Sequence, residues 1–318
     1  MKKTVKAAVL AAVFVLVFGC ASKPAWISDY DAGQKLAEQK NLRIFLLFSA
    51  DETDQINAGL KKIFDAKETQ KTLKEYVLIN IDFSESRYNA AEAAEDADEK
   101  TAEAAEKAQE LLLRDSDVAQ RYSVQGLPAA YILTKEGYVL ASLELDPETA
   151  TAAQFVELFA AQQPQIDSVY ALLNKIESSA GPDKVLAIND LYEATEVQYR
   201  NLLSALFEPV PDLDPENKTG FLGKFMLQIA YHTAMSYITA GDIDSAVQEF
   251  LAAAESPALS PEEKQESLFT AAYFMANTGA GDIESVQAYL QQAYDAAPES
   301  ENAPMIVEIL GGFKAQQE

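Results

Sequence analysis

Residues 42–56 read LRIFLLFSADETDQI, and this stretch decides how the N-terminal half of the chain folds. Its first seven residues are apolar apart from one arginine, which is typical of a strand buried on both faces. Small and acidic residues follow at once, as they do at helix starts, where side-chain oxygens cap free N–H groups and carboxylates oppose the helix dipole. Many α/β proteins carry their chemistry where a strand leads into a helix N-terminus.

Strand and helix patterns alternate on either side of this stretch. In chain order, the sequence predicts a helix over 26–41, a strand over 42–48, an amphipathic helix through Leu60, Ile63 and Phe64, a strand over 76–83, a helical insertion, strands over 129–134 and 137–143, and a helix over 149–163. The last two strands flank the turn sequence KEG and form a predicted hairpin. The order predicts an α/β domain with a βαβ unit, a connecting helix, a hairpin and a final helix.

The insertion between the second and third strands has an unusual composition. Residues 88–113 are rich in alanine and glutamate and contain few large apolar residues before Leu111. This composition favours a solvated helical insertion or a partly disordered arm, which we place at 84–114. A sharper alternative is an acidic docking arm for a basic partner.

The first twenty residues have the pattern of an export signal. A basic start, MKK, precedes an apolar run over residues 7–18, which is short for a membrane span. The run ends in VFGC, in which Gly19 directly before Cys20 resembles the lipobox of bacterial lipoproteins. The resemblance implies that residues 1–19 are a signal peptide, that Cys20 is the lipid attachment site and that residues 20–25 form a tether.

Two alternatives stay open for this segment: an ordinary secretory signal that ends near Ala21 or Ala25, and an uncleaved anchor. The lipobox interpretation predicts an exported protein, lipid-anchored in the bacterial cell envelope and facing the periplasm or the cell surface. A chain with a net charge of −25 is repelled by anionic lipid headgroups, so the acyl chains would have to supply the membrane attachment.

Composition argues against several classes of function. The chain has 25 basic and 50 acidic residues, and it offers no basic stripe to neutralise phosphates, so a nucleic-acid partner is not expected. Cys20 is the only cysteine. If it carries lipid, the folded protein has no thiol for a disulfide, a nucleophile or a zinc–thiolate site.

From residue 165 onward, strand patterns disappear and helices follow one another. The sequence AGDIDSAVQEFLAAAESP, at 240–257, returns as AGDIESVQAYLQQAYDAAP at 280–298, an offset of 40 residues. Helical hairpins that recur at a fixed period are typical of stacked solenoids.

This region resembles divergent tetratricopeptide repeats over residues 216–300. The first unit has small and aromatic residues at the family's spacing: Ala234, Tyr237, Ala246, Phe250 and Ala253. The same register in the second unit gives Phe274, Asn277, Val286, Leu290, Ala293 and Pro298, of which only the later part fits. We therefore expect an all-α, tetratricopeptide-like domain over 164–318, with a generic helical bundle as the alternative.

The first half also resembles a known family. Residues 123–133, SVQGLPAAYIL, combine a helix end, a Gly-x-Pro step and a strand. Together with Trp26 and the end of the quoted strand, they resemble the thioredoxin family over 26–163. The resemblance implies that Pro128 follows a cis peptide bond and that exposed backbone at Leu127 pairs with an extended peptide, so Leu127 and Pro128 mark the expected peptide-binding groove.

Thioredoxins carry a Cys-x-x-Cys pair directly after the strand that residues 42–48 resemble. Here that pair falls at Thr53 and Ile56, and neither residue can form or resolve a mixed disulfide. Nearby acidic residues such as Asp51 and Asp54 would also oppose thiolate formation if a cysteine were restored. We therefore expect a redox-inactive domain without catalytic residues.

Other chemistry finds little support in the sequence. His232 is the only histidine, no local nucleophile accompanies it, and a packing or surface role is the simpler interpretation. Residues 212–217, DLDPEN, alternate oxygen ligands but lack EF-hand spacing and its bidentate glutamate. Walker and dinucleotide glycine patterns are absent, so neither a metal nor a cofactor is expected.

These patterns favour a cell-envelope lipoprotein that acts as a non-catalytic protein–protein interaction scaffold. It would bind a protein or extended peptide through the redox-inactive domain and the helical repeats. An alternative is a thioredoxin-like thiol–disulfide or chaperone-type assistant in the periplasm, and an insulin-reduction assay would separate the two. A substrate-binding component of a transporter is a third hypothesis, but it needs a cleft between two α/β lobes, which an all-helical second half does not provide.

Overall fold

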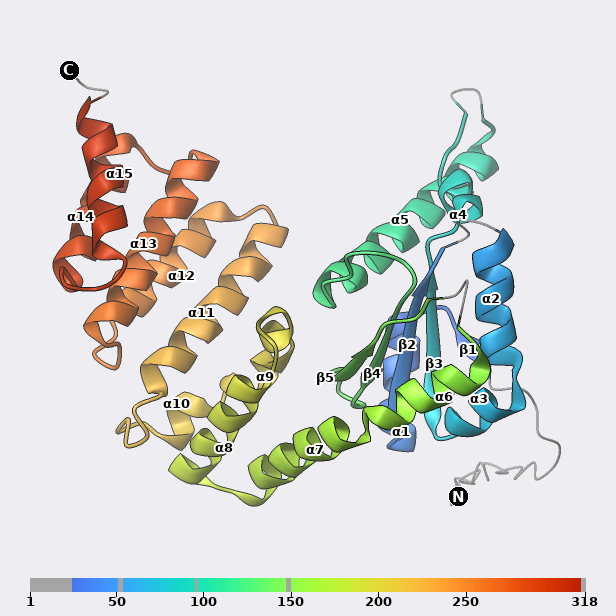
Figure 1. The fold of residues 1–318 in the computed structure, drawn as a ribbon. Helices are drawn as coiled ribbons and strands as arrows, with labels where there is room; N and C mark the ends of the chain where they lie inside the picture. Colours follow the sequence, from blue (N-terminus) through green and yellow to red (C-terminus); the bar gives the residue numbers. More distant parts are fainter. Residues whose placement is uncertain (1–24, 51–53, 95–96, 147–149, 316–318) are drawn as a thin grey trace, which may run out of the picture.

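The computed structural model describes residues 25–50, 54–94, 97–146 and 150–315, which form an α/β domain followed by an all-helical region (Figure 1). The α/β domain contains β1 (Trp26–Ile27), α1 (Tyr30–Lys40), β2 (Arg43–Ser49), α2 (Asp54–Asp65), α3 (Lys67–Thr72), β3 (Tyr76–Asp82), α4 (Glu85–Ala90), α5 (Glu99–Arg121), β4 (Ala129–Leu133), β5 (Val139–Leu143) and α6 (Ala152–Ala161). The helical region contains α7 (Gln163–Ser178), α8 (Gly181–Ala194), the 3-10 helix η1 (Val197–Leu203), α9 (Ser204–Phe207), α10 (Val210–Leu213), α11 (Leu222–Thr239), α12 (Ile243–Ala254), α13 (Pro261–Thr278), α14 (Ile283–Ala296) and α15 (Ala303–Ala315). The predicted fold class is therefore confirmed.

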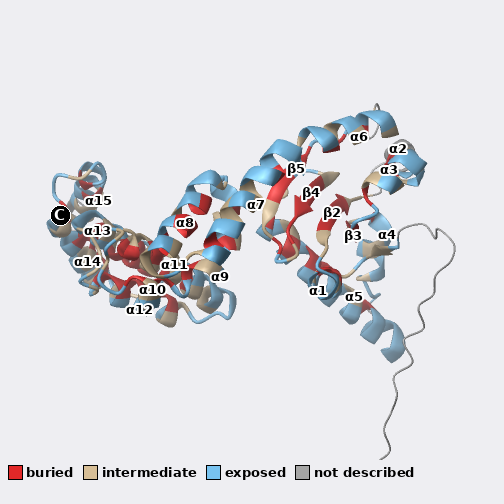
Figure 2. Cartoon of the chain, turned by 90° about the horizontal axis from the view of Figure 1, so that it is seen from below, coloured by how far each residue is buried: buried red, intermediate tan, exposed pale blue. Residues whose placement is uncertain are grey.

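Strand β2 is the centre of the five-stranded sheet that the described residues form, in the order β1-β3-β2-β4-β5. It runs parallel to β3 and antiparallel to β4, and β1 runs parallel to β3. Side chains of β2 alternate between the two faces of the sheet, so Phe45 and Leu47 enter one core while Ile44, Leu46 and Phe48 enter the other. Both faces are buried (Figure 2), which explains the apolar run over residues 44–48.

Different helices cover the two faces of the sheet. Helices α2 and α6 supply Ile63, Phe155 and Phe159 to the core that contains Phe45. Helices α1 and α5 supply residues such as Tyr30 and Val118 to the opposite core, and Tyr122, directly after α5, joins them. The sheet is therefore sandwiched between two helical layers, an arrangement that buries both faces of this mixed sheet.

The start of the domain differs from the helix predicted over 26–41. Trp26 and Ile27 instead form a short strand beside β3, and the helix begins only at Tyr30. The Asp29 side chain determines this start because its Oδ1 accepts a hydrogen bond from the Ala32 amide at 2.8 Å. Helix α3 was also absent from the prediction, since its six residues are too few to show a period.

Buried tyrosines tie the helical layer to the hairpin. The hydroxyl groups of Tyr30 and Tyr122 lie 2.5 Å apart, and the Tyr122 hydroxyl donates to the Gly137 carbonyl at 3.0 Å. The Tyr131 hydroxyl donates to the Tyr122 carbonyl at 3.1 Å. Burial raises the pKa of Tyr122 well above its ordinary value, so this side chain is a neutral donor at physiological pH.

The helical region is joined to the α/β domain by two elements. Helix α7 follows α6 almost without interruption, and its Ile166 packs in the α/β core while Ile176 packs in the helical core. The 3-10 helix η1 inserts Tyr199 into the α/β domain, where its ring meets the Tyr131 ring edge-on at 6.2 Å between centroids. Tyr199 is only 7% exposed, so it acts as a core residue of a domain that ends before it in the sequence.

Helices α11 to α14 pack in consecutive pairs around buried alanines, including Ala234 and Ala246. Phe274 and Asn277, the two residues that do not fit the repeat spacing, are also not buried: Asn277 is exposed and Phe274 is only half-buried. The residues of α13 that enter the core are Gln265, Ser267, Leu268, Thr270, Ala271, Ala272 and Met275. The turn from α13 to α14 is longer by one residue than the turn from α11 to α12, so the 40-residue offset does not extend to the preceding helices.

Within the described residues, no helix combines the length and the apolar character that a membrane crossing requires. This finding concerns residues 25–315 with their gaps and does not extend to the N-terminal apolar run.

The insertion of Tyr199 yields a test of domain coupling. We expect Tyr199→Ala to lower the free energy of unfolding by about 3–5 kcal/mol, as other large-to-small core substitutions do. The control Val197→Ala, at a side chain 74% exposed on the same short helix, should change it by less than about 0.5 kcal/mol.

The only tryptophan, Trp26, reports on the α/β domain, while far-ultraviolet circular dichroism is dominated by the helices. The two signals should give one urea midpoint in the wild type and separate midpoints in Tyr199→Ala. Two midpoints in the wild type, or one unchanged midpoint in the variant, would contradict the coupling.

Candidate functional site

The carboxyl ends of β2 and β3 lie at the same end of the sheet because these strands are parallel. The antiparallel strand β4 begins at that end, where Ala129 is in register with Phe48. The residues after β2, the residues after β3 and the loop before β4 therefore converge. Proteins with α/β sheets commonly bind ligands at the carboxyl ends of their strands.

A groove of about 1070 Å³ lies at this end of the sheet. Helices α4 and α5 form its walls, and both lie beside the end of the sheet in Figure 1. Its lining residues are Ala50, Phe83, Glu85, Tyr88, Ser116, Ala119, Gln120, Ser123, Val124, Gln125, Gly126 and Leu127. Glu85 is the single charged residue among them, so the described lining combines an apolar floor with one acidic group.

The loop before β4 presents backbone to this groove. The Leu127–Pro128 peptide bond is cis, as the resemblance to thioredoxins implied. Within the described structure, the backbone groups of Gln125, Gly126 and Leu127 form no hydrogen bond with another backbone or side-chain group. Unpaired backbone N–H and C=O groups in such a loop can form hydrogen bonds with an extended segment of another protein.

An ion pair fixes the two walls of the groove to each other. Arg87 on α4 donates from Nη1 to Asp115 Oδ2 on α5 at 2.6 Å and to the Asp82 carbonyl at 2.7 Å. The Asp115 side chain is 6% exposed and the Arg87 side chain 27%, so water screens this pair only weakly. Asp82 also accepts hydrogen bonds from the backbone and hydroxyl of Ser84, which fixes the start of α4.

The predicted insertion therefore contributes to one wall of the groove, through Glu85 and Tyr88 of α4. It consists of α4 and the first part of the 23-residue helix α5, with residues 95–96 outside the described structure. Ala105 and Leu112 are buried, whereas most of the acidic residues around them face solvent. Composition alone could not place Tyr88 in a groove. The insertion begins directly after β3, however, and that position predicts that it lies beside the carboxyl ends of the strands.

The structure places the residues singled out in the sequence as follows. Leu127 lines the groove, and Pro128 follows it into β4; both are partly buried. Cys20 and Thr53 lie outside the described residues. Ile56 belongs to α2, but its side chain is not part of the described structure.

The other candidate sites have local structural explanations. His232 is exposed on α11. Asp214, in the possible calcium segment, is buried and accepts hydrogen bonds from the amides of Lys218 and Thr219 at 2.8 Å, so it holds a turn. Across the described residues, no group of three or more His, Cys, Asp or Glu side chains is placed to hold a metal.

The Arg87–Asp115 pair can be tested by a double-mutant cycle. We expect Arg87→Gln and Asp115→Asn to be coupled by about 1–3 kcal/mol in the free energy of unfolding, because each leaves a poorly solvated partner. The solvent-exposed pair Lys175–Asp190, also at 2.6 Å, is the matched control and should show coupling of about 0–1 kcal/mol. Equal coupling in the two cycles, measured by urea denaturation, would show that α4 is not held by this pair.

Comparisons with known proteins agree with this description. A family described as a thioredoxin-like domain matches residues 30–161, and a family described as an uncharacterised protein C-terminal domain matches residues 221–318. An uncharacterised protein of Treponema pallidum (strain Nichols) is 23% identical over 189 residues, which cover 59% of this chain and 63% of that protein. The alignment thus spans less than two thirds of this relative's length.

Among solved structures, a DsbH oxidoreductase matches 50% of this chain and 95% of its own, with 18% identity and a TM-score of 0.33. The match of residues 30–161 to the thioredoxin-like family assigns the fold of the N-terminal part. The chain is therefore built from a thioredoxin-like domain without a Cys-x-x-Cys pair, followed by an all-helical region of packed helices.

Proposed function

We propose that this protein is a cell-envelope lipoprotein that acts as a non-catalytic protein–protein interaction scaffold, and that its groove holds an extended segment of a partner. The observation that carries the proposal is the loop Gln125–Leu127, whose backbone is unpaired beside the groove. An extended segment that pairs with this loop would satisfy those groups and place alternate side chains in the groove.

The absence of a redox pair supports a binding role for this domain. Thr53 and Ile56 occupy the positions that the resemblance assigns to the two cysteines, and Cys20 is the only cysteine in the chain. A thiol–disulfide cycle needs an attacking and a resolving thiol, and these residues supply neither. The domain therefore has a groove that can bind a peptide but no cysteine pair that can transfer electrons.

The lining indicates the chemistry of the bound segment. Phe83, Tyr88 and Leu127 suit apolar side chains, whereas Glu85 suits a basic one. The net charge of −25 adds a long-range attraction for cationic partners and repels acidic ones. The preferred segment is therefore extended and alternates apolar with basic residues.

The location and the second binding surface are parts of the same proposal. The export pattern and Cys20 support a lipid anchor that holds the protein in the envelope, facing the periplasm or the cell surface. The paired packing of α11 to α14 around alanines supports divergent tetratricopeptide-like repeats. In that arrangement, Met235 and Tyr273, which are 51% and 56% exposed, would form part of a second protein-binding face.

The groove can be tested with a defined peptide. A fluorescein-labelled ten-residue peptide of alternating lysine and valine should bind saturably at physiological ionic strength, as measured by fluorescence anisotropy. Tyr88→Ala should weaken this binding five- to tenfold, because it removes an aromatic side chain of the groove wall that is 49% exposed and lies outside the buried cores.

Two controls separate the groove from general attraction of charge. Leu186→Ala removes a large exposed side chain, 40% exposed, from the helical region and should leave the affinity unchanged. A peptide of alternating glutamate and valine should not bind measurably. Equal weakening by both substitutions, or equal binding of both peptides, would rule out the groove as the binding site.

A further inference from the structure

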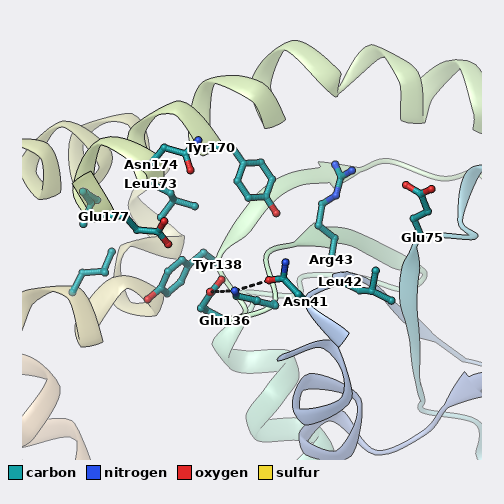
Figure 3. A pocket seen from close by; sticks show the side chains of 13 residues that line it. Asn41, Leu42, Arg43, Glu75, Glu136, Tyr138, Tyr170, Leu173, Asn174 and Glu177 are labelled. Atoms are coloured by element: carbon teal, nitrogen blue, oxygen red, sulfur yellow. Dashed lines mark hydrogen bonds and ion pairs between the residues drawn. The ribbon is translucent and has the colours of Figure 1, made fainter. Parts of the chain in front are cut away.

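A second cavity, of about 670 Å³, lies where β2 and β3 begin, at the end of these strands opposite to the groove (Figure 3). The α/β domain contributes Arg43, Glu75 and Tyr138, and helix α7 contributes Tyr170 and Glu177. Cavities between domains are common positions for small-molecule sites, and this volume is in the usual range. The proposed function makes no use of this cavity.

Arg43 is the unusual residue of the cavity. Its guanidinium group lies 4.9 Å from the centre of the Tyr76 ring, its partner across the strands, and 6.0 Å from the centre of the Tyr170 ring. The chain has five arginines, and Arg87, Arg114 and Arg200 form ion pairs.

Arg43 has neither an ion pair nor a hydrogen bond to any described residue, in a protein with twice as many acidic as basic residues. Its planar fork of N–H donors matches a carboxylate group, which can accept two of them at once. The tyrosine rings hold this fork at the wall of the cavity, so little side-chain freedom would be lost on binding.

Other groups in the cavity divide into those already engaged and those still available. Lys135 donates to Asn41 Oδ1 at 2.7 Å and lies 3.7 Å from Glu136, so its charge is matched inside the protein. Glu177 and Glu75, like Arg43, have no ion pair among the described residues. The available charges are therefore one cation and two carboxylates.

The arrangement on α7 separates these charges. Tyr170, Asn174 and Glu177 occupy positions i, i+4 and i+7, so they share one face of the helix. Figure 3 shows the Tyr170 ring between Arg43 and Glu177, with Tyr138 on the Glu177 side. Burial raises the pKa of Tyr170, which leaves its hydroxyl as a neutral donor near the centre of the cavity.

We propose that this cavity binds a short zwitterionic peptide with an apolar side chain, such as a tripeptide, with its C-terminal carboxylate on Arg43 and its N-terminal ammonium group on Glu177. Apolar residues of the lining, Leu42, Leu173, Ile176 and Leu206, would contact the side chain. A phosphate would carry two negative charges into a site with two unpaired glutamates, so this charge pattern disfavours it. Because β2 supplies Arg43 and α7 supplies Glu177, the site is complete only when the two parts of the chain are docked.

Four compounds that differ in their charged groups test the proposal by isothermal titration calorimetry at pH 7. These probes are the tripeptide alanyl-phenylalanyl-alanine, its N-acetylated form, which lacks the ammonium group, its C-terminal amide, which lacks the carboxylate, and inorganic phosphate. The tripeptide should bind at least fivefold more tightly than either single-charge form and more tightly than phosphate. Phosphate binding more tightly than the tripeptide, or all four binding equally, would overturn the assignment.

Matched substitutions assign each charge. Arg43→Gln should weaken the binding of the tripeptide and of its N-acetylated form at least tenfold, while Arg121→Gln, at the other arginine without an ion pair and outside the cavity, should change neither. Glu177→Gln should weaken binding of the tripeptide but leave binding of the N-acetylated form unchanged.

The exposed position of Glu177 keeps the test independent of folding, because this variant should retain the wild-type melting temperature even if Arg43→Gln does not. Equal effects of Arg43→Gln and Arg121→Gln, or an effect of Glu177→Gln on both ligands, would contradict the proposed orientation.

Discussion

The pairing of β2 on both sides is the constraint on which the rest of this structure depends. The strand is hydrogen-bonded to β3 and β4 along most of its length and sends alternate side chains into two cores. This pairing therefore fixes the positions of both ends of β2. Ala50, directly after its carboxyl end, lines the groove, and Arg43, at its amino end, lines the cavity beside α7. The two proposed binding sites are the two ends of one buried strand, some 20 Å apart by the usual rise of a strand.

The two sites depend differently on the helical region. The groove is built within the thioredoxin-like domain, where Arg87 and Asp115 join its walls. The cavity needs α7, which packs in both cores, and the seating of Tyr199 among the tyrosines of the sheet stabilises that docking. A ligand in the cavity would contact both parts and would therefore stabilise their docked arrangement. The groove could keep its partner even if the helical region moved.

Sequence patterns predicted the elements that have strong local signals. Apolar runs gave β2, β3 and β4, and the Gly-x-Pro step gave the cis bond at Pro128 through a family resemblance. The two-residue strand β1 escaped prediction because so short a segment has no periodicity. The groove wall at Tyr88 and the pairing of Arg43 with the Tyr170 ring also escaped, since they depend on contacts between distant parts of the chain.

Hydrogen–deuterium exchange with the lysine–valine peptide tests the central claim most directly, because it reports on backbone amides residue by residue. The claim is that an extended segment pairs with the unbonded backbone beside the groove. It predicts slower exchange at the amides of Gln125, Gly126 and Leu127 when the peptide is bound, together with the facing residues of α4. Slowing confined to α11–α15, or no change in the loop at saturating peptide, would contradict it.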